Sequence, residues 1–391
     1  AKIVTERMKP VLNSVIEKAQ QGFIKDGNIV GSLILVKEII EYCNEEDKEG
    51  ALILMDFKKA YDRIDRDFMM KTLKAMNFGP DFVGMVEMLY AEVLAKVEVN
   101  GELSEEFVTK GGVRQGCPLS PFLFICVLEL MAIAIRENES LEGIVEPDTQ
   151  EGDKISLFAD DSCICMGKPA TQAREARVTM KSYEDASGSA LHDGKTMIMK
   201  IGRTRKENLT QRQLGVSFKI LEDDDVEKYL GDLVGNTVTE EKRFEKPMAK
   251  MVKTGGRWNR ENITVYGRAL VANTLMMPTI CFRANVNGMT KKMTANILKE
   301  IKEFVWKDVP NLKWGLAVRS AAEGGIGVRD PGALIDGMRI SLLKELQMKA
   351  DQPWTKWLRR KENRLSRRWG VKNVYQGDVP KKKLKELKET C

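Results

Sequence analysis

The spacing of apolar residues predicts a mixture of helices and strands over the first part of the chain. Residues 3–42 show mostly helical spacing, whereas the continuous apolar run 51–55 predicts a buried strand that ends at Asp56. Asp65 is a favourable N-cap residue, and apolar side chains follow it at helical spacing, so a helix is expected to begin there.

Two hairpins are predicted farther along the chain. Residues 93–99 alternate between apolar and polar, and Asn100-Gly101 forms a two-residue turn from which a partner strand returns to residue 109. Short apolar segments also flank Asp160 and Asp161. A second hairpin with these two carboxylates at its tip is therefore expected.

Helices and strands follow each other without regular alternation. Ser120 is expected as the N-cap of a helix over 121–136 that is apolar nearly all round, and a second helix is predicted over 170–187. Residues 189–200 then return as a strand. This order favours an α+β fold with a largely antiparallel sheet over a doubly wound parallel sheet.

The charge of the chain changes sign along its length. Residues 1–240 hold 30 Lys and Arg against 42 Asp and Glu, whereas residues 241–391 hold 33 against 15. The spacing also becomes predominantly helical from about residue 240, so a domain boundary is placed near Asn236. A basic portion of this size predicts a polyanionic partner, although solvated surface charge accounts for part of it.

The last residues combine positive charge with aromatic side chains. Residues 356–391 hold 13 Lys and Arg against 4 acidic residues, together with Trp357, Trp369 and Tyr375. This composition suits stacking on unpaired bases. The helical spacing of Trp354 and Trp357 makes packing within the protein an equally good interpretation.

Composition excludes several classes of protein. Seven cysteines without a Cys-x-x-Cys pair, and a single histidine, His192, cannot form a zinc-finger ligand set, so no zinc is expected. The longest apolar stretch, 122–135, is interrupted by Glu129 and is too short to cross a bilayer, so no membrane partner is expected. The cysteine usage predicts a reducing compartment. An intracellular location is expected, in the nucleus, the cytoplasm or both.

Three carboxylates are candidates for chemistry. Asp56 ends an apolar strand, and Asp160 and Asp161 lie at a hairpin tip, where solubility does not require them. Oxygen ligands from neighbouring strands suit a pair of Mg²⁺ ions that catalyse phosphoryl transfer. An isolated Asp-Asp pair is more often simple turn chemistry, so the assignment depends on the surrounding motifs.

Those motifs resemble the reverse transcriptases of non-LTR (LINE-type) retrotransposons. The resemblance rests first on residues 54–62 (LMDFKKAYD), 112–121 (GVRQGCPLSP) and 158–161 (FADD). It continues through further segments, namely 21–24 (QGFI), 187–188 with Lys195, 229–231 (YLG), 267–270 (GRAL) with Pro278, and 324–330 (GGIGVRD).

The resemblance implies a fold and an activity. The expected fold is the right-hand fold of polymerases, with partial fingers and an antiparallel palm sheet in 1–236, a mostly helical thumb or connection in 237–350, and a basic aromatic tail in 351–391. The implied activity is RNA-directed DNA polymerase, which transfers nucleotides from dNTPs to a primer 3′-hydroxyl. The implied partners are an RNA template, a DNA primer or target, and dNTPs.

The resemblance also assigns roles to individual residues. Two Mg²⁺ ions, with Mn²⁺ as a substitute, are expected on the carboxylates, and Lys195 is either the general acid for pyrophosphate or a solvated lysine. Tyr61 is either the steric gate against the ribose 2′-hydroxyl or a core aromatic. The remaining roles go to two groups of residues: the substrate-binding set Phe57, Tyr61, Arg114, Gln115 and Gly116, and the primer grip Tyr229, Leu230 and Gly231.

The chain departs from the family pattern in places. Lys25-Asp26-Gly27 stands where Gly-Arg usually follows the early motif, and His192 stands where Asn is common. The start at Ala1 predicts a fragment without the upstream strands, so we expect intact metal ligands and an incomplete grip on the triphosphate. An endonuclease is expected to come from elsewhere.

Two alternatives remain open from the sequence. The first is a catalytically impaired reverse-transcriptase-like scaffold that binds RNA, although a scaffold has no evident need for three clustered carboxylates. The second is a group II intron maturase, which shares the palm motifs. The segment 324–330 favours the retrotransposon.

Overall fold

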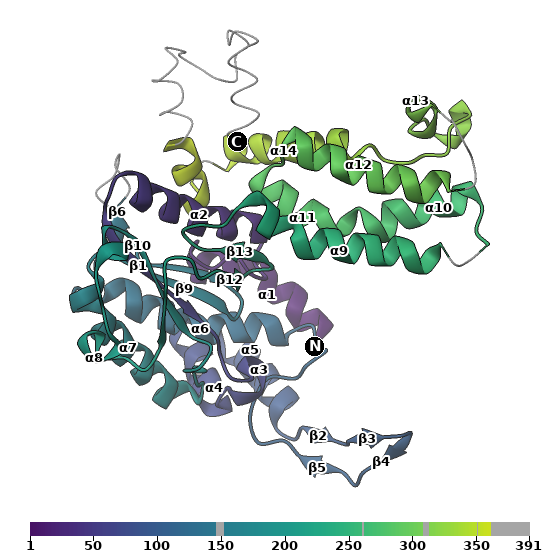
Figure 1. Ribbon diagram of the computed structural model, residues 1–391. Helices are drawn as coiled ribbons and strands as arrows, with labels where there is room; N and C mark the ends of the chain where they lie inside the picture. Colours follow the sequence, from purple (N-terminus) through teal and green to yellow (C-terminus); the bar gives the residue numbers. More distant parts are fainter. Residues whose placement is uncertain (146–151, 260–261, 308–312, 350, 361–391) are drawn as a thin grey trace. The chain divides into compact units, whose positions relative to one another are not determined.

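A computed structural model describes residues 1–145, 152–259, 262–307, 313–349 and 351–360 (Figure 1). The contacts divide the chain into two compact units. The first comprises Ala1–Asn236 with Gln352–Trp357, and the second comprises the described residues of Thr237–Asp351 together with 358–360.

A five-stranded sheet forms the centre of the first unit. Its spatial order is β11 (Lys219–Leu221), β10 (Met197–Gly202), β1 (Glu49–Met55), β9 (Asp161–Met166) and β8 (Ile155–Phe158). All neighbours are antiparallel except β10 and β11. The prediction of an α+β fold with a largely antiparallel sheet is therefore confirmed.

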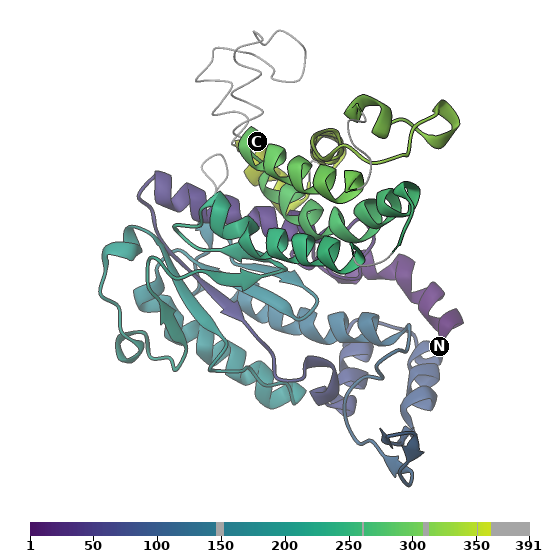
Figure 2. The same ribbon diagram turned by 45° about the vertical axis from the view of Figure 1, so that its right-hand side comes forward.

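Helices cover the sheet, and two views show their arrangement (Figures 1 and 2). Helices α6 and α7 contact each other and the sheet, and α2 contacts β8 and β10. The helices of this unit are α1 (Lys2–Val15), α2 (Ile29–Glu45), α3 (Ala60–Arg63), α4 (Arg66–Ala75), α5 (Pro80–Tyr90), α6 (Ser120–Glu137), α7 (Pro169–Ser187) and α8 (Gln211–Leu214).

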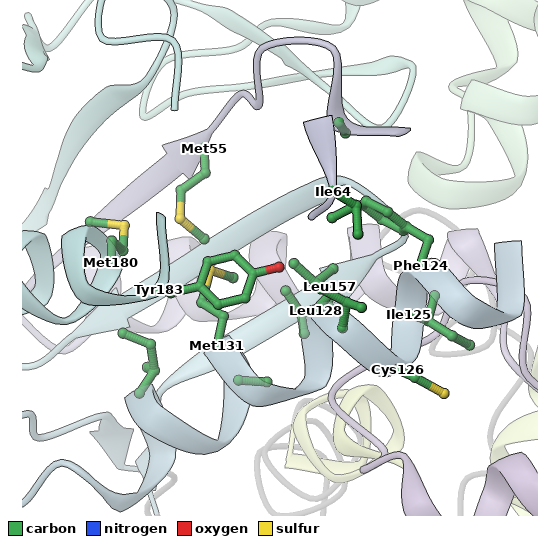
Figure 3. Close-up of a cluster of buried hydrophobic side chains, with 14 of the residues drawn as sticks. Met55, Ile64, Phe124, Ile125, Cys126, Leu128, Met131, Leu157, Met180 and Tyr183 are labelled. Atoms are coloured by element: carbon green, nitrogen blue, oxygen red, sulfur yellow. The ribbon is translucent and has the colours of Figure 1, made fainter. Parts of the chain in front are cut away.

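Strand β1 is buried on both faces, because its side chains alternate between two apolar layers. Ala51, Ile53 and Met55 belong to the cluster that α6 and α7 complete. Leu52 and Leu54, which are also buried, point to the opposite face. Figure 3 shows Met55 among the methionine and aromatic side chains of this cluster. The rigid position of β1 fixes the point at which Asp56 leaves the sheet.

Short hairpins complete the first unit. Strands β2 (Leu94–Ala95), β3 (Glu98–Val99), β4 (Glu102–Leu103) and β5 (Phe107–Val108) form the predicted hairpin, which projects from the rest of the unit (Figure 1). Asn100 and Gly101 both have positive φ, as a tight two-residue turn requires. The other two pairs are β6 (Ile144–Val145) with β7 (Gly152–Asp153), and β12 (Glu227–Tyr229) with β13 (Asp232–Val234).

Three predicted boundaries shift. Helix α6 begins at Ser120 with Leu119 as its N-cap, because the Ser120 hydroxyl bonds Tyr90 Oη (3.1 Å) instead of capping the helix. Asp161 is the first residue of β9, since it pairs with Phe158 across a two-residue turn. Strand β10 begins only at Met197. The residues before it hydrogen-bond the backbone of the residues that follow β1, so they do not extend the strand.

Residues 353–360 are helical, and part of this segment packs into the first unit. Trp354 and Trp357 are 1% and 0% exposed. The Trp357 ring meets Tyr42 edge to face at 5.4 Å, and its indole N–H donates to Asp153 (2.5 Å). The packing interpretation of both tryptophans is confirmed, and the alternative of base stacking by Trp357 is wrong. Trp369 and Tyr375 lie outside the described residues.

The second unit is helical where the structure describes it. Its helices are α9 (Glu240–Trp258), α10 (Val265–Val271), α11 (Pro278–Asn287), α12 (Lys291–Trp306), α13 (Trp314–Ala317) and α14 (Pro331–Met348), with a π-helical turn at Ala272–Met276. Its core includes Phe244, Met251, Ile301 and Phe304. Among all the helices described in the chain, none has the length and hydropathy needed to span a membrane.

The glycine-rich segment 324–330 is tied into this unit. The Asn273 side chain, on the π-helical turn, donates to the Gly327 carbonyl (2.8 Å) and accepts from the Arg329 amide (2.9 Å). Asp330 caps α14 and accepts from the Trp314 indole. The side chains of Asn273 and Trp314 thus hold the segment in this unit.

Candidate active site

Strand register brings the three candidate carboxylates together. Asp56 directly follows Met55, which pairs with Ser162, and Asp161 directly precedes Ser162. Asp56 and Asp161 therefore lie at the same end of neighbouring strands, which are roughly 4.8 Å apart. Asp160 occupies the adjoining turn, after Ala159, whose φ is +54°. Residues about a hundred positions apart in sequence meet at one end of the sheet.

The carboxylates repel each other. The pKa of Asp161 is raised, first by desolvation of its carboxyl group and then by the negative charges of Asp160 and Asp56, while Lys228 opposes the shift. The Lys195 ammonium lies 3.7 Å from Asp56 Oδ2. Negative charge therefore accumulates at this edge, with lysines on two sides.

The donor set fits a hard divalent cation, because carboxylate oxygens are the ligands that Mg²⁺ prefers. A cation would also relieve the repulsion that raises the pKa of Asp161. Within the described part of the chain, however, no three Asp, Glu, His or Cys side chains are already gathered closely enough to hold an ion. The carboxylates are neighbours that a cation would have to draw together.

The backbone of Asp56 is held by a turn that the sequence did not reveal. Its carbonyl accepts from the His192 amide (2.7 Å), and its amide donates to the buried Thr196 hydroxyl (3.3 Å). The Lys195 amide bonds the His192 carbonyl (2.8 Å) in the same turn. One short segment therefore positions Asp56 and presents Lys195 to it. Phe57 bridges the same segment at Leu191.

Tyr61 lies between the core and the carboxylates. Its ring stacks on Phe124 with centroids 4.6 Å apart, and the residue remains partly exposed. Burial, followed by the negative charge of Asp160, raises the pKa of Tyr61 to about 12. The phenol is thus protonated at neutral pH and close to the carboxylates. This position is compatible with core packing of one ring face and with a gate at the other.

The loop that carries Gln115 and Gly116 runs directly against the Tyr61 segment. The Val113 amide donates to the Tyr61 carbonyl, and the Gly112 amide donates to the Ile64 carbonyl, both at 2.8 Å. Gln115 Nε2 donates to Asp62 Oδ1 (2.9 Å). No role was predicted for Asp62, although it lies inside the first motif.

The two remaining residues of this loop differ in their surroundings. Gly116 is exposed with φ +81°, a conformation that favours glycine. The Arg114 guanidinium lies over the Tyr90 ring, 5.9 Å from its centroid. Gly116 therefore presents open backbone, whereas Arg114 is directed toward the protein.

The expected primer-grip residues lie where β12 turns into β13, with Tyr229 as the last residue of β12 and Leu230 and Gly231 in the turn. Tyr229 and Leu230 are buried, and Gly231 is exposed with φ +86°. The buried carboxylate of Asp232 forms an ion pair with Lys37 of α2. Lys228, whose charge acts on Asp161, belongs to the same hairpin and was missed. The only sequence signal for Lys228 was its position directly before the 229–231 motif.

Residues 1–231 match the reverse transcriptase (RNA-dependent DNA polymerase) family, so the chain belongs to that family. Its relatives are proteins of transposable elements. Over 335 residues the chain is 28% identical to the transposon TX1 uncharacterized 149 kDa protein of Xenopus laevis, covering 84% of this chain and 25% of that protein. Membership among the reverse transcriptases of non-LTR retrotransposons is thereby confirmed, and with it the right-hand polymerase fold.

Further relatives belong to R2 elements. The chain is 30% identical over 153 residues to the retrovirus-related Pol polyprotein from type-2 retrotransposable element R2DM of Drosophila melanogaster, covering 38% of this chain and 14% of that protein. It spans about a quarter or less of the length of these curated relatives. Among solved structures, a Candida tropicalis telomerase in complex with a telomeric RNA fragment matches 91% of this chain and 56% of its own, with 13% identity and a TM-score of 0.45.

Proposed function

We propose that this chain is the polymerase core of a retrotransposon, transferring nucleotides from dNTPs to a primer 3′-hydroxyl on an RNA template. The observation that carries the proposal is the meeting of Asp56, Asp160 and Asp161 at one end of the sheet, beside Tyr61 and the Gln115 loop. In the extended chain these residues are far apart, and the strand register of this fold brings them together.

The family generally uses divalent metal ions, and the three carboxylates would hold two Mg²⁺ ions, or Mn²⁺ in their place. When bound, the ions supply charge neutralisation and a lowered hydroxyl pKa at the reacting phosphate. The carboxylates themselves would orient the reacting groups, and Lys195, whose ammonium lies 3.7 Å from Asp56, would donate a proton to the leaving pyrophosphate.

Other side chains would select the substrate. Tyr61 would oppose a ribose 2′-hydroxyl with the exposed part of a ring that Phe124 holds rigid. Gln115 and Gly116 would face the nascent base pair, and Phe57 and Arg114 would also bind the nucleotide. Tyr229, Leu230 and Gly231 would contact the primer. Template and primer phosphates would bind the basic portion after residue 240.

We assign the regions of the chain on the same basis. Residues 1–236 would be partial fingers and palm, 237–350 the thumb, and 351–391 a basic tail whose part from 361 lies outside the described residues. The proposed site of action is intracellular, in the nucleus, the cytoplasm or both, because the template and the target are nucleic acids of the cell.

Primer extension on an RNA template with Mg²⁺ tests the proposal. Wild type is compared with Asp160→Asn and with Lys71→Ala, a control variant at an exposed position. Extension by wild type and Lys71→Ala, with a loss of several powers of ten in Asp160→Asn, is expected, because one carboxylate of the site is then neutral. RNA binding without extension in any of the proteins would instead support a scaffold.

A further inference from the structure

Arg66 is the first residue of α4, and its guanidinium hydrogen-bonds one short segment, residues 109–112. Its Nη1 donates to the Thr109 carbonyl (2.6 Å), and its Nη2 donates to the Thr109 hydroxyl (3.1 Å) and the Gly111 carbonyl (3.0 Å). Its Nε donates to the Gly112 carbonyl (3.2 Å). Every nitrogen of the side chain therefore holds the segment that leads into the Gln115 loop.

Tyr90 contacts both Arg66 and the loop that Arg66 holds. The Arg66 guanidinium lies over the buried Tyr90 ring, 5.4 Å from its centroid. The Tyr90 hydroxyl bonds Ser120 Oγ (3.1 Å) and accepts from the Arg114 amide (3.4 Å). Arg66 therefore holds the loop at residues 109–112, and Tyr90 holds it at Arg114.

This attachment acts on the segment that carries Tyr61. Gly112 and Val113 donate to the carbonyls of Ile64 and Tyr61, so the position of the loop sets the position of the Tyr61 backbone. Gln115 reaches Asp62 from the same loop. Greater mobility at Thr109–Gly112 would therefore also displace Tyr61, the proposed gate, and Gln115, which is proposed to face the base pair.

We propose that Arg66 is a positioning residue for nucleotide selection, which holds the 109–116 loop and Tyr61 in register without touching substrate. The inference rests on the proposed function for its consequence in catalysis, but its structural half stands separately. Lysine cannot replace Arg66, because one ammonium group cannot span acceptors on three successive parts of the loop.

The reactivity of the Cys117 thiol tests whether Arg66 holds the loop, and it requires no measurement of catalysis. This partly buried thiol lies directly after Gly116, and its alkylation by iodoacetamide can be followed by mass spectrometry in the full chain. Arg66→Ala and Arg66→Lys should speed alkylation of Cys117 by about fivefold or more, because the loop opens more often. Lys71→Ala, an exposed position on the same helix, should leave the rate unchanged.

Kinetics test the functional half. Both Arg66 variants should raise the KM for dNTP by about tenfold, and lower the preference for dNTP over rNTP by a similar factor, with kcat changed less. Lys71→Ala should retain the wild-type values. If Arg66→Ala fails to fold, Arg66→Lys, which keeps the charge and the aliphatic stem, decides the question.

The outcomes separate the two claims. Unchanged Cys117 alkylation in folded Arg66→Lys would overturn the inference whatever the activity. Faster alkylation with an equal fall in kcat for dNTP and rNTP, and no change in KM or selectivity, would also overturn it and reduce Arg66 to a structural residue. A wild-type chain without polymerase activity would count against the proposed function, and the alkylation result would still decide whether Arg66 holds the loop.

Discussion

At the scale of the residue, desolvation and charge repulsion act on the carboxylates of the site. The pKa of Asp161 is raised because desolvation and two neighbouring carboxylates disfavour its ionised form. A carboxyl whose pKa is higher in the folded than in the unfolded state destabilises the fold when ionised. This penalty is complete above the folded-state pKa and disappears as the pH falls below the unfolded-state value, near 3.9.

Asp161→Asn should therefore stabilise the metal-free protein at neutral pH. Because the residue is exposed and solvent screens its charge, the gain in Tm should be small, about 1–2 °C. The gain should vanish near pH 3.5, and Mg²⁺ should raise the Tm of wild type more than that of the variant. Differential scanning calorimetry at both pH values measures this, and a lower Tm for the variant at pH 7 without metal would contradict it.

Tyr61 allows a prediction about selectivity. Tyr61→Ala should increase rNTP incorporation relative to dNTP by about tenfold or more, because the ring that Phe124 supports is gone. Tyr61→Phe should keep the wild-type preference, since the ring and not the phenol would clash with the 2′-hydroxyl. Single-nucleotide incorporation measures both, and equal selectivity in Tyr61→Ala and wild type would show that Tyr61 is only a core aromatic.

At the scale of the element, local signals predicted the strands and hairpins better than the loop contacts. The apolar run before Asp56 and the Asn100-Gly101 turn are encoded within a few residues, and both elements form as expected. The helix start at Ser120 was missed because the Ser120 hydroxyl hydrogen-bonds Tyr90 and does not cap the helix. Arg66 was missed because its partners are mostly backbone carbonyls more than forty residues away, which no side-chain pattern reveals.

Two glycines of the loop should differ in cost. A Cβ at Gly112 would lie 2.7 Å from the Asp62 Cα, with φ at +75°, whereas Gly116 has a positive φ but open space around it. Gly112→Ala should lower the free energy of unfolding by about 3 kcal/mol or more, and Gly116→Ala by about 1 kcal/mol, in urea titrations. Equal costs would mean that the close approach of the loop to Asp62 is not maintained in solution.

At the scale of the whole molecule, charge and packing place a limit on where the tail can be removed. Trp354 and Trp357 are buried in the first unit, whereas residues 361–391 add 10 Lys and Arg against 4 acidic residues. The sequence alone predicted the basic character but left open whether Trp357 packs within the protein. That depended on Tyr42 and Asp153, which lie far away in the chain.

Truncation after residue 360 should therefore leave the fold intact and weaken nucleic-acid binding. The slope of log K against log salt should become shallower, because fewer phosphates are neutralised. Truncation before Trp354 should instead destabilise the first unit, at about 3–5 kcal/mol for each buried tryptophan lost. Salt titrations of RNA binding with thermal melts separate the effects, and an unchanged slope after truncation at 360 would remove the tail from RNA binding.

We propose that Asp56 and Asp160 together form one cation site, although they lie far apart in sequence. Electron paramagnetic resonance of Mn²⁺ titrated into the full chain, with template, primer and dNTP present, tests it most directly. Asp56→Asn and Asp160→Asn should each weaken binding of the same ions by about tenfold or more, while Lys71→Ala binds like wild type. Wild-type Mn²⁺ binding in either carboxylate variant would contradict the claim.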